Sequence, residues 1–213
     1  MKFAINVPNF GSFGDPRLVA GLAREAEASG WDGMFIWDHV MWTHPQNFPV
    51  TEPWVTLAAM AVATQRIRIG AMVTPLPRRR PWQVARQATT LDHLSGGRAV
   101  LGVGIGGDWF GDYSRFGEPA DDRTRGAQLD EALDVVTGLW SGEPFSYAGT
   151  HYTVRDTQFL PAPLQQPRIP IWVAGVWPGT RPFRRAARYG GVAPIPRNDA
   201  PLTPDDVRAM LAY

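Results

Sequence analysis

Short apolar runs alternate along this chain with longer stretches whose apolar residues recur at helical spacing. The runs KFAINVPN, GMFIWDHV, RIRIGAMVTP and AVLGVGIGG follow one another at similar intervals, and each ends in a polar or glycine-rich turn. Strands that alternate with helices in this way predict right-handed βαβ units around a parallel sheet. We predict six strands, at about residues 2–8, 33–38, 67–73, from 99 onward, 169–175 and 191–195.

Residues that favour helix ends mark the predicted helices. Asp15 is a typical N-cap, Pro16 suits a first helical turn, and Gly30 ends the first helix. Further helices are predicted from residue 53, at about 81–94, 123–140 and 181–189, and from 204 to the end of the chain. The intervening segment SYAGTHYTVRDTQFLPAP is typical of a hairpin insertion, with Ala148 and Gly149 at its turn.

Six βα units are fewer than the eight of a closed parallel barrel, which usually takes about 250 residues. We expect one domain, 1–213, with about two units of the barrel absent at its C-terminal end. The first strand would then lack a neighbour, which leaves Phe3, Ile5 and Val7 on or near a free edge. Since a free edge favours association, we expect a homo-oligomer.

Composition narrows the classes of function. The formal net charge of +1 gives no reason to expect nucleic acid or an anionic membrane as a partner. The absence of cysteine excludes disulfides, thiolate metal sites and a cysteine nucleophile. The chain enters a strand directly after Met1 and Lys2, and no apolar stretch approaches the length that a bilayer needs, so we expect a cytoplasmic protein.

The second predicted strand carries the most informative pair, because Asp38 and His39 lie at its C-terminal end. Ligands and catalytic groups gather at that end of parallel strands. Histidine can exchange a proton at neutral pH, which makes His39 a candidate catalytic residue. A buried histidine satisfied by backbone groups is the alternative. A neighbouring carboxylate such as Asp38 can fix the tautomer of a histidine, but successive strand side chains point to opposite faces. We therefore expect Asp38 instead to anchor the strand end or the edge of a bound cofactor.

The run GVGIGG matches G-x-G-x-x-G at Gly102, Gly104 and Gly107. A dinucleotide loop would need a helix to begin at once, whereas DWFGDYSRFGEP follows, so we predict no such site. The glycines indicate either the close approach of a flat ring to the strand ends or tight packing inside a barrel.

Two further groups of residues have open interpretations. The three consecutive arginines Arg78 to Arg80 either hold an anionic substrate or coenzyme tail, or form a solvated surface. Trp42, Trp109 and Trp177 fall in loops that follow strands, where they could line a pocket for an apolar substrate.

Three segments of the chain resemble one family, in order and at the same spacing. They are WDHV at 37–40, RIRIGAMVTP through GVGIGG at 66–107, and LWSGEPFSYAGTHYTV followed by PRIPIWVAGVWPGTRPFRRAARYGGV. This pattern resembles the luciferase-like flavin-dependent oxidoreductases. The resemblance implies a TIM barrel with an insertion after strand four, and an enzyme that uses reduced FMN with oxygen or the deazaflavin coenzyme F-420 as a hydride carrier. It also implies a small-molecule substrate, with a flavin reductase as a partner that supplies reduced cofactor.

The resemblance implies roles for individual residues as well. His39 would be catalytic, and Asp108 is the nearest match to a carboxylate that acts as an acid in one branch of the family. The family often has a non-prolyl cis peptide within 71–74, and the backbone amides of 174–177 would hold the flavin phosphate. The residues expected to bind the cofactor are Asp38, Ala71, Met72, Val73, Thr74, Gly104, Gly106, Gly107, Ala174, Gly175, Val176 and Trp177.

Two other functions stay open from the sequence. The protein could bind a flavin without turnover, as shortened relatives of luciferase do. A metal-dependent TIM-barrel hydrolase could use Asp38, His39 and His44, but no other strand end offers a convincing ligand, and we predict no metal site.

Overall fold

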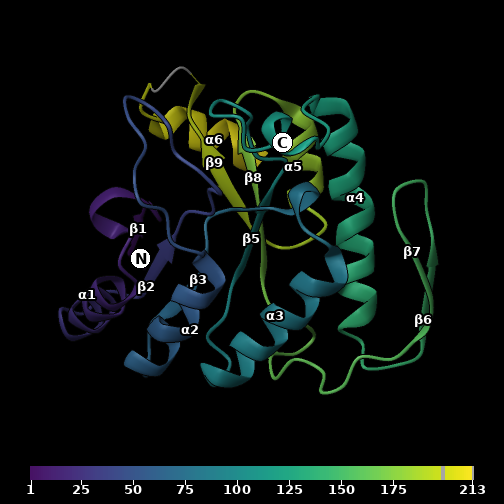
Figure 1. Cartoon of the computed structure of the whole chain (residues 1–213), viewed down its shortest axis with the longest axis horizontal. Coiled ribbons are helices and arrows are strands. Elements are labelled where there is room, and N and C mark those ends of the chain that lie inside the picture. The colour runs from purple at the N-terminus through teal and green to yellow at the C-terminus, as the bar shows by residue number, and fades with distance from the viewer. Residues whose placement is uncertain (198–199, 213) are drawn as a thin grey trace.

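The computed structural model describes residues 1–197 and 200–212 and contains the six predicted strands, all parallel (Figure 1). They form two adjoining sheets, in the orders β1-β2-β3 and β4-β5-β8-β9, which a bridge between Ile69 and Ala99 connects. The sheet therefore follows chain order, as βαβ connections require. The strands are β1 (Ala4–Val7), β2 (Gly33–Ile36), β3 (Arg68–Ala71), its short continuation β4 (Thr74–Pro75), β5 (Leu101–Gly104), β8 (Ile171–Val176) and β9 (Val192–Ile195).

The predicted helices are also confirmed. Asp15 is the N-cap of the first helix, where its side chain accepts a hydrogen bond from the Arg17 amide at 2.8 Å. Tyr213, to which the last helix was expected to run, lies outside the described residues. The helices are α1 (Pro16–Ala28), α2 (Pro53–Ala63), α3 (Pro81–Leu94), α4 (Asp122–Leu139), α5 (Thr180–Ala186) and α6 (Pro204–Ala212), with short 3-10 turns η1 (Gly11–Phe13), η2 (Leu76–Arg78) and η3 (Ser114–Phe116).

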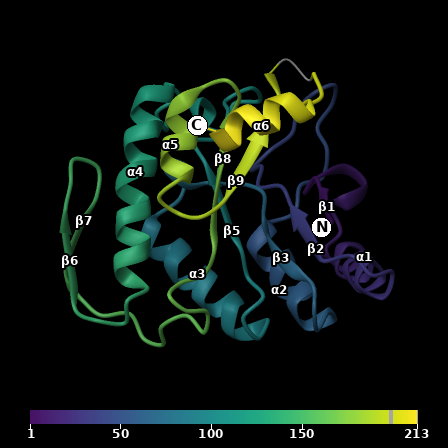
Figure 2. The ribbon, with the colours of Figure 1, turned by 180° about the vertical axis from the view of Figure 1, so that it is seen from behind.

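The predicted insertion is an antiparallel hairpin of β6 (Phe145–Ala148) and β7 (Thr153–Thr157). It stands on the outer side of α4, away from the parallel strands, in both views (Figures 1 and 2). The Glu131 carboxylate of α4 accepts hydrogen bonds from the amides of Thr150, His151 and Tyr152, at 2.8 to 3.0 Å. These contacts fix the hairpin turn to the helix and leave the strand ends uncovered by the insertion.

The core lies between the parallel strands and the helices that follow them. Ile36, Ile69 and Val173 from the strands and Leu57 and Leu133 from the helices are fully buried. Burial of each such side chain contributes roughly 1.5–3 kcal/mol to folding. This packing makes the sheet a firm support for the loops at its carboxyl ends.

The two outermost strands are edges within the part of the chain that the structure describes. There β1 pairs with β2 alone, and β9 pairs with β8 alone. Phe3 is 58% exposed near the first edge, while Val7 is buried; Val192 and Ile195 are exposed on β9. The expected free edge at the first strand is thus confirmed. Among the described helices, none is both long and apolar enough to span a membrane.

Candidate active site at the carboxyl ends of the strands

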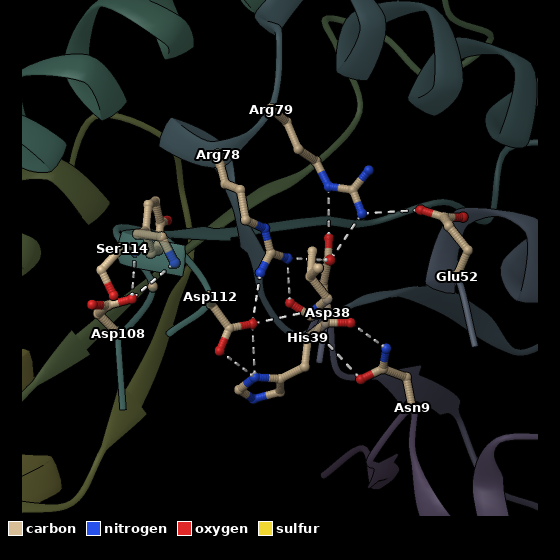
Figure 3. Close-up of polar contacts among 12 residues, drawn as sticks. Asn9, Asp38, His39, Glu52, Arg78, Arg79, Asp108, Asp112 and Ser114 are labelled. Carbon is tan, nitrogen blue, oxygen red and sulfur yellow. Dashed lines mark hydrogen bonds and ion pairs between the residues drawn. The ribbon is translucent and has the colours of Figure 1, made fainter. Parts of the chain in front are cut away.

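The loops after β1 and β2 are joined by one buried asparagine. The Asn9 side-chain oxygen accepts a hydrogen bond from the His39 amide at 3.1 Å. Its Nδ2 donates to the carbonyls of His39 and Thr51, both at 2.8 Å (Figure 3). Because all three bonds hold backbone, Asn9 fixes the position from which the His39 side chain extends.

Asp38 is buried in an ion-pair network with two of the three consecutive arginines. Arg78 reaches its Oδ1 at 2.7 Å, and Arg79 binds both carboxylate oxygens, at 2.8 and 2.9 Å (Figure 3). Arg79 also pairs with Glu52 at 3.0 Å. Burial alone would lower the pKa of Arg79, but the negative charges of Asp38 and Glu52 have the larger effect. The pKa of Arg79 is therefore raised above its ordinary value. Asp38 therefore anchors the strand end, and the solvated-surface interpretation is wrong for Arg78 and Arg79.

The carboxylate beside His39 is Asp112, which sequence reasoning missed. An oxygen of Asp112 lies 3.4 Å from His39 Nδ1. The same buried side chain accepts hydrogen bonds from Arg78 at 2.9 Å and from the Val40 amide at 3.1 Å. Burial favours a higher pKa for Asp112, but the hydrogen bond and charge of His39, the amide and Arg78 together hold the pKa below its usual value.

Asp108 lies apart from this network in Figure 3. Its Oδ1 accepts hydrogen bonds from the amides of Tyr113 at 2.8 Å and Ser114 at 3.1 Å, which begins the turn η3. Hydrogen bonding from the Ser114 side chain, and then from these amides, lowers the pKa of Asp108. A lowered pKa favours the carboxylate, so the structure does not favour Asp108 as a proton donor, and its role as an acid stays a prediction.

Aromatic rings from three loops surround the His39 imidazole. The Trp42 ring meets it edge to face, with centroids 5.1 Å apart. The Phe10 ring stacks on the Trp42 ring with centroids 3.9 Å apart, and the Phe110 centroid lies 4.0 Å from that of Trp42. Of the three loop tryptophans, Trp42 therefore lies at His39. Trp109 is 79% exposed and Trp177 packs on Phe183 at 5.1 Å.

Three other strand ends meet at the expected cofactor position. The peptide between Met72 and Val73 is cis, as the resemblance implied. A Cβ placed on Gly104 would lie 3.1 Å from Val73 Cγ2 and 3.4 Å from the Ala174 Cβ. The carboxyl ends of β3, β5 and β8 therefore lie next to one another, and the residues between them are small.

Most of the glycines in GVGIGG have a packing explanation. A Cβ on Gly102 would lie 2.3 Å from the Ala71 carbonyl oxygen. Gly106 has a φ of +68°, and a Cβ there would meet Pro75 at 2.8 Å. At Gly107 the obstacle is the exposed Trp109 ring, at 2.5 Å. As the sequence predicts, a loop rather than a helix follows β5.

Two further observations concern the expected cofactor contacts. The Thr74 hydroxyl is fully buried and has no hydrogen-bond partner among the described residues. In the turn after β8, the Trp177 amide donates to the Ile195 carbonyl at 3.3 Å and the Gly179 amide to Val176 at 2.9 Å. Those two amides are thus already satisfied within the protein, which leaves other groups of the turn for a phosphate.

The arrangement does not favour a metal-dependent hydrolase. Both Asp38 oxygens bind arginines, and His44 is exposed. Within residues 1–197 and 200–212, no group of three or more His, Asp or Glu side chains is placed to hold a metal ion.

Parallel βα units with a histidine and carboxylates at the carboxyl ends of the strands are typical of α/β-barrel proteins, which carry their sites at those ends. The chain belongs to the luciferase-like monooxygenase family, because the model of that family matches residues 1–210. The expected family and the TIM-barrel type of fold are thereby confirmed.

Relatives in this family carry out two kinds of chemistry. The chain is 35% identical to the F420-dependent glucose-6-phosphate dehydrogenase of Beutenbergia cavernae, over 82% of this chain and 51% of that protein. It is 32% identical to the oxygenase component of a flavin-dependent trigonelline monooxygenase from Acinetobacter baylyi, over 68% of this chain and 41% of the relative. The chain thus spans about half the length of these curated relatives.

A solved structure shows the same fold. An F420-dependent secondary alcohol dehydrogenase, in complex with an F420-acetone adduct, matches all of this chain and 64% of its own, with a TM-score of 0.81 and 24% identity. The fold of this chain is therefore that of the luciferase-like barrel enzymes.

Proposed function

We propose that this chain forms the cofactor-facing part of a luciferase-like oxidoreductase, in which His39 exchanges a proton with a small organic substrate. The observation that carries the proposal is the His39–Asp112 pair, held by Arg78 at the strand ends and next to the expected cofactor residues. Bound reduced FMN with oxygen, or coenzyme F-420, would supply the electrons. Of the relatives named above, the dehydrogenases are F420-dependent and the trigonelline monooxygenase is flavin-dependent.

Two features of the strand ends support the binding of a flat ring. Val73 and Ala174 lie on either side of Gly104, which has no side chain, and both are partly exposed. The unpaired Thr74 hydroxyl offers a hydrogen bond that no described residue takes. Ala71 to Thr74, Gly104 to Gly107 and Ala174 to Trp177 would hold the cofactor, and Asp38 would support them from the end of β2.

The contact with Asp112 indicates which nitrogen of the His39 imidazole carries the proton. A carboxylate accepts but does not donate, so the Nδ1 of His39 carries the proton in the 3.4 Å contact. Nε2 is then the basic nitrogen, which takes a proton from the substrate or returns one to it. Arg78 and the Val40 amide hold Asp112 at the same time, so the imidazole keeps one tautomer and one orientation.

The loop aromatics shield part of the His39 imidazole, whose side chain is 18% exposed. Trp42 covers one edge of the imidazole and is itself packed between Phe10 and Phe110. The same rings favour an apolar or aromatic part of the substrate beside His39. With FMN as cofactor, a separate flavin reductase would supply the reduced form. The trigonelline enzyme is likewise described as an oxygenase component.

The proposal is tested by turnover of the full chain with small alcohols, aldehydes and aromatic acids. Each is offered with coenzyme F-420, and with reduced FMN plus oxygen. We expect His39→Asn to lower turnover by about a hundredfold while cofactor affinity is nearly unchanged. His44→Asn is the matched control, because His44 is an exposed histidine in the same loop. Equal loss of binding and turnover in His39→Asn would make His39 a cofactor contact, and binding without any turnover would favour a non-catalytic flavin-binding protein.

A further inference from the structure

Four arginines share one face at the C-terminal end of the described βα units. Arg181, Arg184, Arg185 and Arg188 follow the spacing i, i+3, i+4 and i+7 along α5 and the turn after it. The opposite face of α5 is apolar, and its Phe183 is buried against the sheet. The four arginines and Asp130 of α4 line a cavity of about 240 Å³ in the outer helix layer.

Acidic residues of α4 fix two of these arginines. Asp130 binds Arg185 through two hydrogen bonds, of 2.6 and 2.8 Å. Asp134 lies 3.4 Å from Arg188. A guanidinium held by a carboxylate on one side is pre-organised, so it loses less freedom when it binds a second anion.

The cavity wall contains an arginine that the aspartates of α4 do not hold. Asp130 pairs with Arg185 and Asp134 with Arg188. The Arg181 side chain makes no hydrogen bond or ion pair with any residue that the structure describes. Like charges at this spacing repel one another, and a bound dianion would relieve that repulsion.

We infer that this cavity is an anion site that binds a doubly charged phosphoryl group, such as that of inorganic phosphate or pyrophosphate. Guanidinium groups match phosphate oxygens with paired hydrogen bonds, whereas a carboxylate carries half the charge and fewer acceptors. Arg185 supplies the fixed contact and Arg181 the additional charge. The cavity is smaller than most pockets for drug-sized ligands, roughly 300–1,000 Å³, which suits a small anion.

The site is separate from the chemistry at His39. Helix α5 lies beside α4 in both views (Figures 1 and 2), and Arg185 and Arg188 bind Asp130 and Asp134 of α4. Phe183 of α5 packs instead against Gly175 of β8. The inference needs neither the cofactor nor turnover, so it holds or fails independently of the proposed function.

Calorimetric titration of the full chain with pyrophosphate tests the inference, with chloride as the balancing salt so that ionic strength stays constant. We expect saturable binding that Arg181→Gln and Arg185→Gln each weaken by about tenfold, as loss of one charge-assisted contact requires. Arg24→Gln is the matched control, since Arg24 is an exposed arginine on α1. It should leave the affinity unchanged.

A second variant separates a built site from a general charge effect. Asp130→Asn releases Arg185 from its fixed position and should weaken pyrophosphate binding, whereas stronger binding would show a general charge effect and overturn the inference. Asp122→Asn, at the exposed start of the same helix, should leave the affinity unchanged. The inference is overturned if no saturable binding occurs at constant ionic strength, or if Arg24→Gln weakens binding as much as Arg181→Gln.

Discussion

Replacement of Thr74 by valine should make the free protein more stable and the cofactor complex weaker. The Thr74 hydroxyl is fully buried, and no described residue hydrogen-bonds it. An unsatisfied buried hydroxyl costs about 1–3 kcal/mol, and valine replaces it with a methyl group of similar size. Taking the low end, we expect Thr74→Val to raise the free energy of unfolding by about 1 kcal/mol. In a chain of this size that corresponds to a rise of about 2–4 °C in Tm.

The same substitution removes the hydrogen bond that Thr74 is proposed to give the cofactor. A neutral hydrogen bond contributes about 0.5–1.5 kcal/mol, so the Kd for the bound cofactor should rise by about two- to tenfold. Thermal unfolding with and without cofactor, and a fluorescence titration, measure both effects on one preparation. Opposite signs for stability and affinity would show that the hydroxyl is kept for binding.

Thr64→Val is the matched control for this prediction. The Thr64 hydroxyl donates to the Met60 carbonyl at 2.8 Å and accepts from Arg98 at 2.8 Å. Its loss should therefore lower the free energy of unfolding and leave cofactor affinity unchanged. If Thr74→Val also destabilises the free protein, the hydroxyl has a structural partner and the reasoning fails. If affinity is unchanged, Thr74 does not contact the cofactor.

Three further predictions rest on other contacts. Asp112→Asn should lower turnover by about a hundredfold by disturbing the His39 tautomer, with Glu118→Gln in the same loop as control. The pKa of Asp112 is lowered in the folded state, so its contribution to stability is present above the ordinary aspartate pKa of about 3.9 and is lost in acid. The difference in unfolding free energy between wild type and Asp112→Asn should therefore shrink below about pH 4. A difference that stays constant with pH would contradict the ion pairing. Arg98→Met should lower the free energy of unfolding by about 3 kcal/mol, because Arg98 donates hydrogen bonds to the carbonyls of Ala61, Thr64 and Ile67. Cofactor affinity should not change, since these groups lie away from the carboxyl ends of the strands. Val192→Lys on the exposed edge strand β9 should reduce self-association in analytical ultracentrifugation, and an unchanged mass distribution would show that this edge is not the contact.

The fold was predictable because its signals are local. Apolar runs, an N-cap at Asp15, prolines at helix starts and the turn of the hairpin each act within a few residues, and all six strands and six helices were located from them. The structure changed mainly the lengths of strands. The predicted second strand, for example, extends to residue 38, whereas β2 ends at Ile36 and residues 37 and 38 already belong to the loop.

The candidate site was predicted less completely because its contacts are long-range. Asp112 is 73 residues from His39, inside a loop without periodicity, so no spacing rule connects them. The arginines after β4 resembled a solvated charge run. Arg78 and Arg79 are buried only because folding brings Asp38 beside them, and a charge can be buried only with such a partner. An aspartate at a strand end followed by arginines at the next strand end was the one available signal.

The central claim is that the ends of β2, β3, β5 and β8 form a flavin or deazaflavin site with His39 as its proton-transfer group. The most direct test is a titration of the full chain with FMN and with coenzyme F-420, followed by bound-cofactor fluorescence. We predict that at least one of them binds saturably with one site per chain, and that Thr74→Val weakens this binding. If neither cofactor binds while far-UV circular dichroism shows the folded α/β chain, the claim is contradicted.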